Sequence, residues 1–547
     1  MSDHEMRNPY EDEIPKDEVR VPRKVAWLFI ILFLSICVLP PLWRNVTAAE
    51  WRPVTELFKR NAEHDLRRHL KNYEDKLEEA DFRTPAIRSY QRVATGLFRE
   101  GNSKAYVGRG GTLFYRPALD AITGYGPLKP EPDTVAKDPN RPKWNSPQAA
   151  ILKFKEQLAE RGVDLMLVPI PVKPMIYPEQ ARAGSNGFTA PVRHPDTEEF
   201  FKSLREGGVE VVDFADEFFA ARRTAQFLRQ DTHWTPATME RTAASLAEII
   251  AAKPWFREMK KGLETEIRRV EGGHAGDLAE MLHGDGQSIL VPEVHEIGVV
   301  IDRATGQPVA RDADSPIVLL GDSFVNIFND PALGFGDREG PLLGAGFAQH
   351  LAAQLGAKID YAVANGGGAS VVRSEFGKRY DDEVRAKKLV VWVLASRDLF
   401  LSEKPARDAG ISFKDTAFNP KQSPEPKTTP PPPPPASGDR FTGTLLDRTP
   451  NADPAATSYP EALYEAHFEL DAKSAKELGL SDPEIVVYLW SFRNRKLLPS
   501  SQLQVGRSYQ LKLSPWADHP KLQTMQRGEG LGVFAEEFFA EEATPAP

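Results

Sequence analysis

Residues 315–328, SPIVLLGDSFVNIF, decide how the rest of this sequence is interpreted. An apolar run leads into Gly321-Asp322-Ser323, and a second apolar stretch with helical spacing follows. This pattern predicts a buried strand, a tight turn and a helix, a geometry that often presents a nucleophilic serine at the rim of a sheet. The triplet alone is weak evidence, because three specified residues occur by chance in roughly one chain in eight of this length. Ser323 therefore needs a base, an orienting acid and a pocket.

The sequence around this stretch alternates between helical and strand-like segments from residue 149 to residue 396. Short β-rich runs lie at 164–169, 209–214, 317–320, 358–363 and 388–394, and helical segments separate them. This alternation predicts an α/β fold in which a mostly parallel sheet is covered by helices on both faces. Ligands of such sheets bind outside the carboxyl ends of the strands, where we expect Ser323, Asn365 and Gly366 to emerge.

The chain has 547 residues, which is too long for one ordinary core. A net charge of -9 without a Lys/Arg-dominated block argues against a nucleic-acid binder. We expect a small C-terminal β-rich domain whose aromatic residues build a core or stack on sugar rings. The predicted boundaries are 45–100 for a helical spacer, 101–415 for the catalytic domain, 416–440 for a proline-rich linker and 441–547 for the β-rich domain.

The N-terminal run 25–43, VAWLFIILFLSICVLPPLW, carries no charge and is just long enough to cross a bilayer as a tilted helix of about 20 residues. Basic residues crowd its N-terminal flank, whereas only Arg44 follows directly, so residues 1–24 are expected in the cytoplasm and the remainder outside. A cleaved signal peptide and a buried core helix stay open as alternatives. The only cysteine, Cys37, lies inside this run, so the exported part has no disulfide and no thiol nucleophile.

A base and an acid for the serine occur together in residues 230–236, QDTHWTP. Asp231 and His233 are two positions apart, so in an extended segment both side chains project to the same side. We expect His233 to take the Ser323 proton while Asp231 fixes the imidazole tautomer. The alternative is a surface pair next to the helix that begins at Pro236.

The glycine-rich segment 365–368, NGGG, follows a predicted strand and suits an oxyanion hole built from backbone N–H groups together with that of Ser323. A loop that only turns the chain is the alternative. His274, His283 and His295 are irregularly spaced, so we expect neither a metal nor another cofactor. Paired carboxylates for glycoside cleavage stay open, because their separation depends on the fold.

Five segments resemble the SGNH-type alginate O-acetyltransferases, the AlgX and AlgJ group, and related exopolysaccharide acetylation proteins. They appear in the order of that family, with the Asp-His pair upstream of the serine, whereas ordinary SGNH esterases place theirs after it. The segments are VGRGGTLFY (107–115), PIPVKPMIYPE (169–179), DTHW (231–234), GDLAEML (276–282) and GDSF (321–324).

The resemblance implies an SGNH-hydrolase-like three-layer sandwich in which Ser323 is the nucleophile, His233 the general base and Asp231 its orienting acid. The implied enzyme is an inner-membrane O-acetyltransferase with a periplasmic catalytic domain, which passes acetyl groups through an acetyl-serine to an alginate-like exopolysaccharide. A membrane-embedded acyltransferase is the implied donor partner. An esterase that trims acetylated polysaccharide and an inactive sugar-binding or assembly subunit are the alternatives.

The second matching segment also provides Lys173 and Tyr177 as candidate substrate-binding residues. One departure from the family pattern lies at residues 110–112, Gly-Gly-Thr, where the family usually has Asp-Gly-Trp. An aromatic contact near the site is therefore expected to be missing.

Overall fold

The computed structural model describes almost all of the chain from residue 90 onward, together with a few positions between 23 and 46. Met1–Tyr90 and Gln91–Pro547 are separate units, and only the second is described below. Most of the predicted span 25–43 and most of the predicted spacer fall outside the described residues. Within the described part of the chain, no helix has both the length and the apolar character needed to cross a bilayer. The main described ranges are 90–129, 145–181, 187–259, 261–283, 290–335, 343–423 and 440–546. The last of these ranges contains a few isolated residues that are not described.

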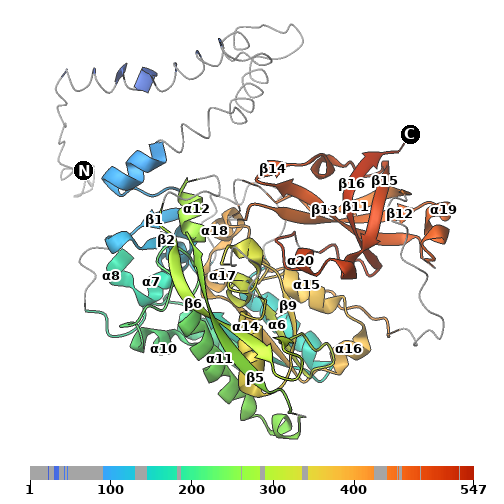
Figure 1. Cartoon of the computed structure of the whole chain (residues 1–547), viewed down its shortest axis with the longest axis horizontal. Helices are drawn as coiled ribbons and strands as arrows, with labels where there is room; N and C mark the ends of the chain where they lie inside the picture. The colour runs from blue at the N-terminus through green and yellow to red at the C-terminus, as the bar shows by residue number, and fades with distance from the viewer. Residues whose placement is uncertain are drawn as a thin grey trace, which may run out of the picture. The chain divides into compact units, whose positions relative to one another are not determined.

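A five-stranded parallel sheet forms the centre of the first domain, as the alternation of segments predicts (Figure 1). Its longest strands are the apolar runs of the sequence, because a parallel sheet covered on both faces buries nearly every side chain. All seven residues of the central strand are buried. In spatial order the strands are β4 (Glu210–Val211), β3 (Asp164–Ile170), β10 (Leu389–Ala395), β8 (Ile317–Gly321) and β9 (Asp360–Val363).

Helices cover both faces of this sheet, and successive residues of β10 alternate between the two cores. Val391 and Val393 pack into the core beneath α11 (Pro236–Ala251) and α14 (Phe347–Leu355). Trp392 packs into the opposite core, together with residues of α6 (Pro147–Ala159), α9 (Thr197–Glu206) and α15 (Val371–Gly377). The first domain is therefore the predicted three-layer sandwich.

Two antiparallel additions flank the sandwich. A hairpin joins β1 (Ala105–Val107) to β2 (Leu113–Tyr115), and a ribbon is formed by β5 (Thr265–His274), β6 (Glu293–Asp302) and the short β7 (Gln307–Pro308). The sequence does not predict this ribbon, because much of β5 is exposed and charged and so lacks the apolar pattern of a strand. Chain beyond residue 415 also belongs to this domain, since the Asn419 N–H donates to Gly377 O at 2.8 Å.

The C-terminal domain is the predicted β-rich unit, and its strands close into a barrel. The ring follows the order β11, β12, β13, β16, β15 and returns to β11; only the β13–β16 pair is parallel. This is the strand connectivity of an OB fold. The five strands are β11 (Phe441–Arg448), β12 (Ala462–Leu470), β13 (Glu484–Arg493), β15 (Ser508–Pro515) and β16 (Glu536–Pro545).

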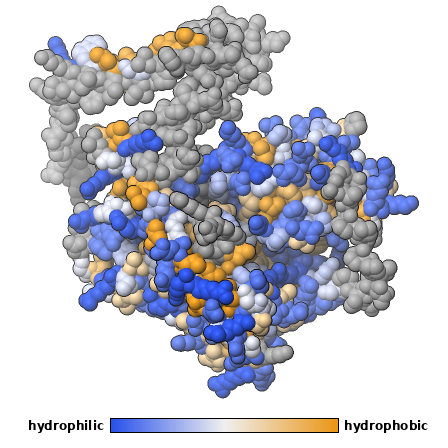
Figure 2. Space-filling view, viewed as in Figure 1, coloured by the Kyte–Doolittle hydropathy of each residue, from blue (hydrophilic) through white to orange (hydrophobic). Residues whose placement is uncertain are grey.

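The large aromatics of the barrel serve mainly as its core. Tyr488, Trp490, Tyr509 and Trp516 are all buried. Hydrophilic side chains predominate on the barrel face that Figure 2 shows. Stacking of these four side chains on sugar rings is therefore not available at the barrel surface.

Candidate active site

Ser323 lies where the sequence places it, at the carboxyl end of a buried strand. β8 ends at Gly321, and Ser323 begins the short helix α13 (Ser323–Asn326). Asp322 caps that helix, because its side chain accepts the Phe324 N–H at 2.9 Å. A Cβ on Gly321 would lie 2.2 Å from the Val325 side chain, so only glycine permits this tight exit from the strand.

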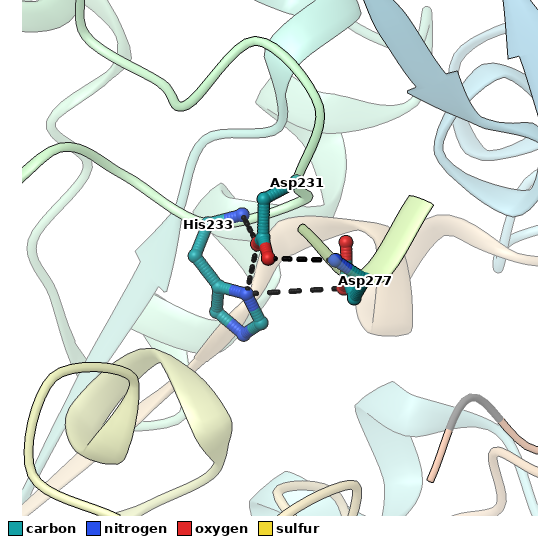
Figure 3. Close-up of side chains that lie close together, drawn as sticks. All are labelled: Asp231, His233 and Asp277. Carbon is teal, nitrogen blue, oxygen red and sulfur yellow. Dashed lines mark hydrogen bonds and ion pairs between the residues drawn. The ribbon is translucent and has the colours of Figure 1, made fainter. Parts of the chain in front are cut away.

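Three predicted residues converge on one hydrogen-bonded chain. His233 Nε2 lies 2.8 Å from Ser323 Oγ. On the other side of the ring, His233 Nδ1 lies 2.6 Å from Asp231 Oδ1, as Figure 3 shows. Asp231 Oδ1 also accepts the backbone N–H of His233 at 2.9 Å, so the two-residue spacing in DTHW folds the carboxylate back onto its own histidine. All three side chains are buried. The arrangement can move a proton from the serine hydroxyl to the imidazole.

Asp277 is a further acid at this site that the sequence reasoning assigned no role. Its backbone N–H donates to Asp231 Oδ2 at 2.9 Å, which occupies the second oxygen of the orienting carboxylate (Figure 3). Its own carboxylate accepts the N–H and the hydroxyl of Thr232 at 2.8 and 2.6 Å. Asp277 belongs to the GDLAEML segment, so the family resemblance of that segment was the only feature of the sequence that pointed to it.

Burial and charge act in opposite directions on these ionisable groups. Burial lowers the pKa of His233, but the neighbouring Asp231 carboxylate outweighs it, so the pKa of the imidazole is raised. Burial likewise raises the pKa of Asp231, and the attraction of His233 reverses this, so that pKa is lowered. Burial and then the charge of Asp231 raise the pKa of Asp277 to about 6. Asp231 is thus the group that stays ionised and favours an imidazolium.

The same three residues also bring possible metal-ligating atoms within 4.8 Å of one another. However, His233 Nδ1 and both carboxylate oxygens of Asp231 already take part in the hydrogen bonds described above. These contacts suit an orienting relay better than a tetrahedral metal site, which would require those same atoms as ligands.

Ser323 opens into a cavity of about 300 Å³. The walls come from both domains: the sandwich contributes Tyr115, Asp277, Gly366 and Arg397, and the barrel contributes Asn451, Tyr459 and Arg527. Arg397 and Asp398 form a buried pair at 3.4 Å that the sequence reasoning missed. Burial raises the pKa of Asp398 to about 7 despite this neighbouring cation.

The glycine-rich segment is at the site, but Asn365 is used for other contacts. Gly366 lines the cavity and adopts a φ of +70°. The Asn365 N–H donates to Thr524 O at 2.9 Å, and its side-chain amide donates to Asp330 Oδ2 at 2.8 Å. These bonds engage the backbone N–H and one N–H of the side-chain amide, and Asn365 is not among the residues that line the cavity. Within this segment, Gly366 remains the residue predicted to contribute a backbone N–H to the oxyanion hole.

Lys173 and Tyr177 do not line the cavity of Ser323; both line a separate cavity. The buried ammonium of Lys173 donates to the carbonyl oxygens of Leu113 and Arg229, at 2.8 and 3.2 Å, and to that of Asp231. The Tyr177 hydroxyl donates to a backbone carbonyl at 3.0 Å and accepts a backbone N–H at 2.9 Å. Both side chains therefore brace the backbone that leads to the Asp-His pair.

Residues 131–396 match the family model described as "SGNH hydrolase-like domain, acetyltransferase AlgX". The chain is 25% identical over 313 residues to "Probable alginate O-acetylase AlgJ" of Pseudomonas syringae pv. tomato, which covers 55% of this chain and 73% of the relative. It is 29% identical over 189 residues to the Pseudomonas aeruginosa protein of the same name, a match that covers 34% of this chain and 43% of the relative.

Two solved structures are also similar to this chain. The "O-Acetyltransferase Domain of Pseudomonas putida AlgJ" has a TM-score of 0.38 at 19% identity and covers 54% of this chain and 92% of that one. Pseudomonas aeruginosa AlgX has a TM-score of 0.39 at 18% identity, and the match covers 53% of this chain and 61% of that one.

The sandwich is thus an SGNH hydrolase-like domain. The match over residues 131–396 covers a little under half of the chain, and together with the AlgJ relatives it confirms the resemblance to the AlgX/AlgJ group stated from the five sequence segments.

Proposed function

We propose that this protein is an extracytoplasmic O-acetyltransferase that passes acetyl groups through Ser323 to hydroxyls of an exopolysaccharide. The observation that carries the proposal is the hydrogen-bonded chain from Ser323 to His233 and Asp231 at the floor of a cavity, in a domain of the AlgX type. The printed names of the relatives support an alginate-like polymer as the acceptor.

In the first half-reaction, Ser323 Oγ attacks the acetyl carbonyl and its proton moves to His233 Nε2, 2.8 Å away. The tetrahedral intermediate collapses, the bond to the donor breaks, and the donor oxygen takes the proton from His233. Asp231 stabilises the imidazolium while it exists. In the second half-reaction a sugar hydroxyl gives its proton to His233 and its oxygen attacks the carbonyl carbon of the acetyl-serine. The bond between that carbon and Ser323 Oγ then breaks, and Oγ takes the proton back from His233.

The proposal includes an inner-membrane anchor at residues 25–43 and a periplasmic location of the catalytic domain, both supported by the uncharged run and its basic flank. A membrane-embedded acyltransferase would supply the acetyl donor. This partner rests on the family analogy alone.

The test uses the full chain with a chromogenic acetyl ester as donor and alginate as acceptor. We expect the parent protein to form sugar acetyl esters and expect Ser323→Ala and His233→Ala to form none. Ser203→Ala is the matched control, because Ser203 lies on α9 and bonds only within its own helix and to Gln148. Full activity of either site variant would contradict the assignment.

The same assay separates the alternatives. Release of acetate without sugar esters would identify an esterase, because water then replaces the sugar hydroxyl. Failure of a fluorophosphonate to label Ser323 would favour a non-catalytic assembly subunit. In cells, the acetyl content of the exopolysaccharide should fall when Ser323→Ala replaces the intact gene.

A further inference from the structure

Tyr459 brings a phenol from the C-terminal barrel to the serine of the sandwich. It lies between β11 and β12, and its phenol is near enough to the Ser323 side chain to interact with it. It lines the same cavity as His233 and Gly366. A residue beyond the predicted linker therefore shares the cavity of the group predicted to react.

The glycine-rich segment of the sandwich is shaped to receive this ring. A Cβ on Gly366 would lie 2.9 Å from Cε2 of Tyr459, so the absent side chain leaves space for the phenol. The neighbouring Asn365 N–H bonds Thr524 O, which belongs to the loop between β15 and β16. Two barrel loops thus close over the segment that the sequence predicts as an oxyanion hole. In an OB fold, these two loops are the ones that commonly contact oligomeric ligands.

Buried charges hold the barrel in this position. Lys378, just beyond α15 of the sandwich, places its ammonium 3.0 Å from Glu465 and 2.7 Å from Glu537, both on barrel strands. Arg527 of the barrel lies 3.4 Å from Glu375 of the sandwich. Removing one partner of such largely buried ion pairs is costly, so these pairs favour the arrangement that places Tyr459 in the cavity.

The protonation state of the Tyr459 phenol allows it to donate a hydrogen bond. Burial raises the pKa of Tyr459 above its ordinary value, although the neighbouring Ser323 side chain acts in the opposite direction. The hydroxyl consequently keeps its proton at physiological pH and cannot replace His233 as the base. The acyl oxygen of a tetrahedral intermediate is only two bonds away from Ser323 Oγ, so a neutral donor in this cavity can stabilise the negative charge that develops on the acyl oxygen.

We propose that Tyr459 is a catalytic residue whose phenolic O–H donates a hydrogen bond to the acyl oxygen of the tetrahedral intermediate at Ser323, so that the barrel completes the active site. The inference rests on the proposed acyl transfer. As the Oγ–C bond forms, the carbonyl π electrons move to the acyl oxygen, and Tyr459 shares its proton without losing it. The electrons return when the bond to the leaving group breaks, and that group takes its proton from His233.

The test compares Tyr459→Phe with the parent in the full chain, using turnover of a chromogenic acetyl ester. Loss of one such donor should lower kcat by about 10²- to 10³-fold. KM and the acidic limb of the pH profile should not change, because the phenol neither titrates in that range nor sets the imidazole pKa. Tyr464→Phe is the matched control, since the buried Tyr464 hydroxyl also loses one bond, to Ser500 O, inside the same barrel. Its kcat should stay within about two-fold of the parent.

A second measurement separates this inference from the proposed function. The rate at which a fluorophosphonate labels Ser323 requires an oxyanion donor but no acetyl acceptor, and it should fall at least about ten-fold in Tyr459→Phe. Equal labelling and equal kcat in parent and variant would overturn the role of Tyr459 while leaving acyl transfer intact. A parent that is neither labelled nor active would refute both the proposed function and the inference.

Discussion

Replacing Asp231 by Asn removes one charge and one acceptor from the centre of the site. The carboxylate now accepts three N–H groups: Oδ1 takes the backbone N–H and the Nδ1–H of His233, and Oδ2 takes the backbone N–H of Asp277. An amide has only one oxygen. If that oxygen faces His233, the amide NH₂ faces the N–H of Asp277, and two buried donors oppose each other.

The size of the effect follows from these contacts. An unsatisfied buried donor costs about 1–3 kcal/mol in the free energy of unfolding. The loss of the charge that stabilises the imidazolium has the larger consequence for the reaction, and an acid-to-amide change of this kind lowers kcat by about 10⁴-fold, equivalent to about 5 kcal/mol. The pKa of His233 should also fall, because burial remains while the attraction of Asp231 is lost.

The assay is turnover of a chromogenic acetyl ester across the pH range, alongside thermal unfolding. In the parent protein the acidic limb should lie above the ordinary imidazole pKa of 6.5, because His233 must be neutral to accept a proton and its pKa is raised. In Asp231→Asn the limb should move to lower pH and the plateau should fall. Asp164→Asn, at an exposed carboxylate 3.8 Å from Lys155, is the matched control. A plateau within about ten-fold of the parent would refute the reasoning.

Three further substitutions test neighbouring groups. Asp277→Asn should move the acidic limb to lower pH, because Asp277 contributes to the raised pKa of His233. The pKa of Asp277 is raised from 3.8 to about 6 in the folded protein, so its contribution to the free energy of unfolding is fully present below pH 3.8 and is lost as the pH rises through 6. In urea unfolding, the free energy of unfolding of the parent relative to that of Asp277→Asn should therefore fall between pH 3.8 and pH 6. Lys173→Met should lower the free energy of unfolding by about 3 kcal/mol, since three carbonyls lose a buried donor, and equal melting temperatures would contradict this. Lys378→Met leaves the buried Glu465 and the partly buried Glu537 without this cation, so it should lower the free energy of unfolding by about 3–5 kcal/mol and should slow ester turnover in the direction expected for Tyr459→Phe. Unchanged stability would contradict this expectation.

The parallel sheet was predictable because its strands, β3, β8 and β10, are short apolar runs that can only be buried. The β5–β6 ribbon was not predictable in this way. Its outer strand carries exposed charges, and backbone pairing rather than side-chain burial holds it against β6.

The sequence by itself determined the serine, its base and its acid as candidates, because local features mark each of them: a strand-turn-helix at Ser323, and a two-residue spacing that places Asp231 beside His233. Only the tertiary structure decided what surrounds them. Asn365 turned out to bond the barrel, and Tyr459 turned out to share the cavity of the serine. Local sequence patterns report hydrogen bonds and burial within one segment, whereas a cavity wall depends on which distant segments the packed cores bring together.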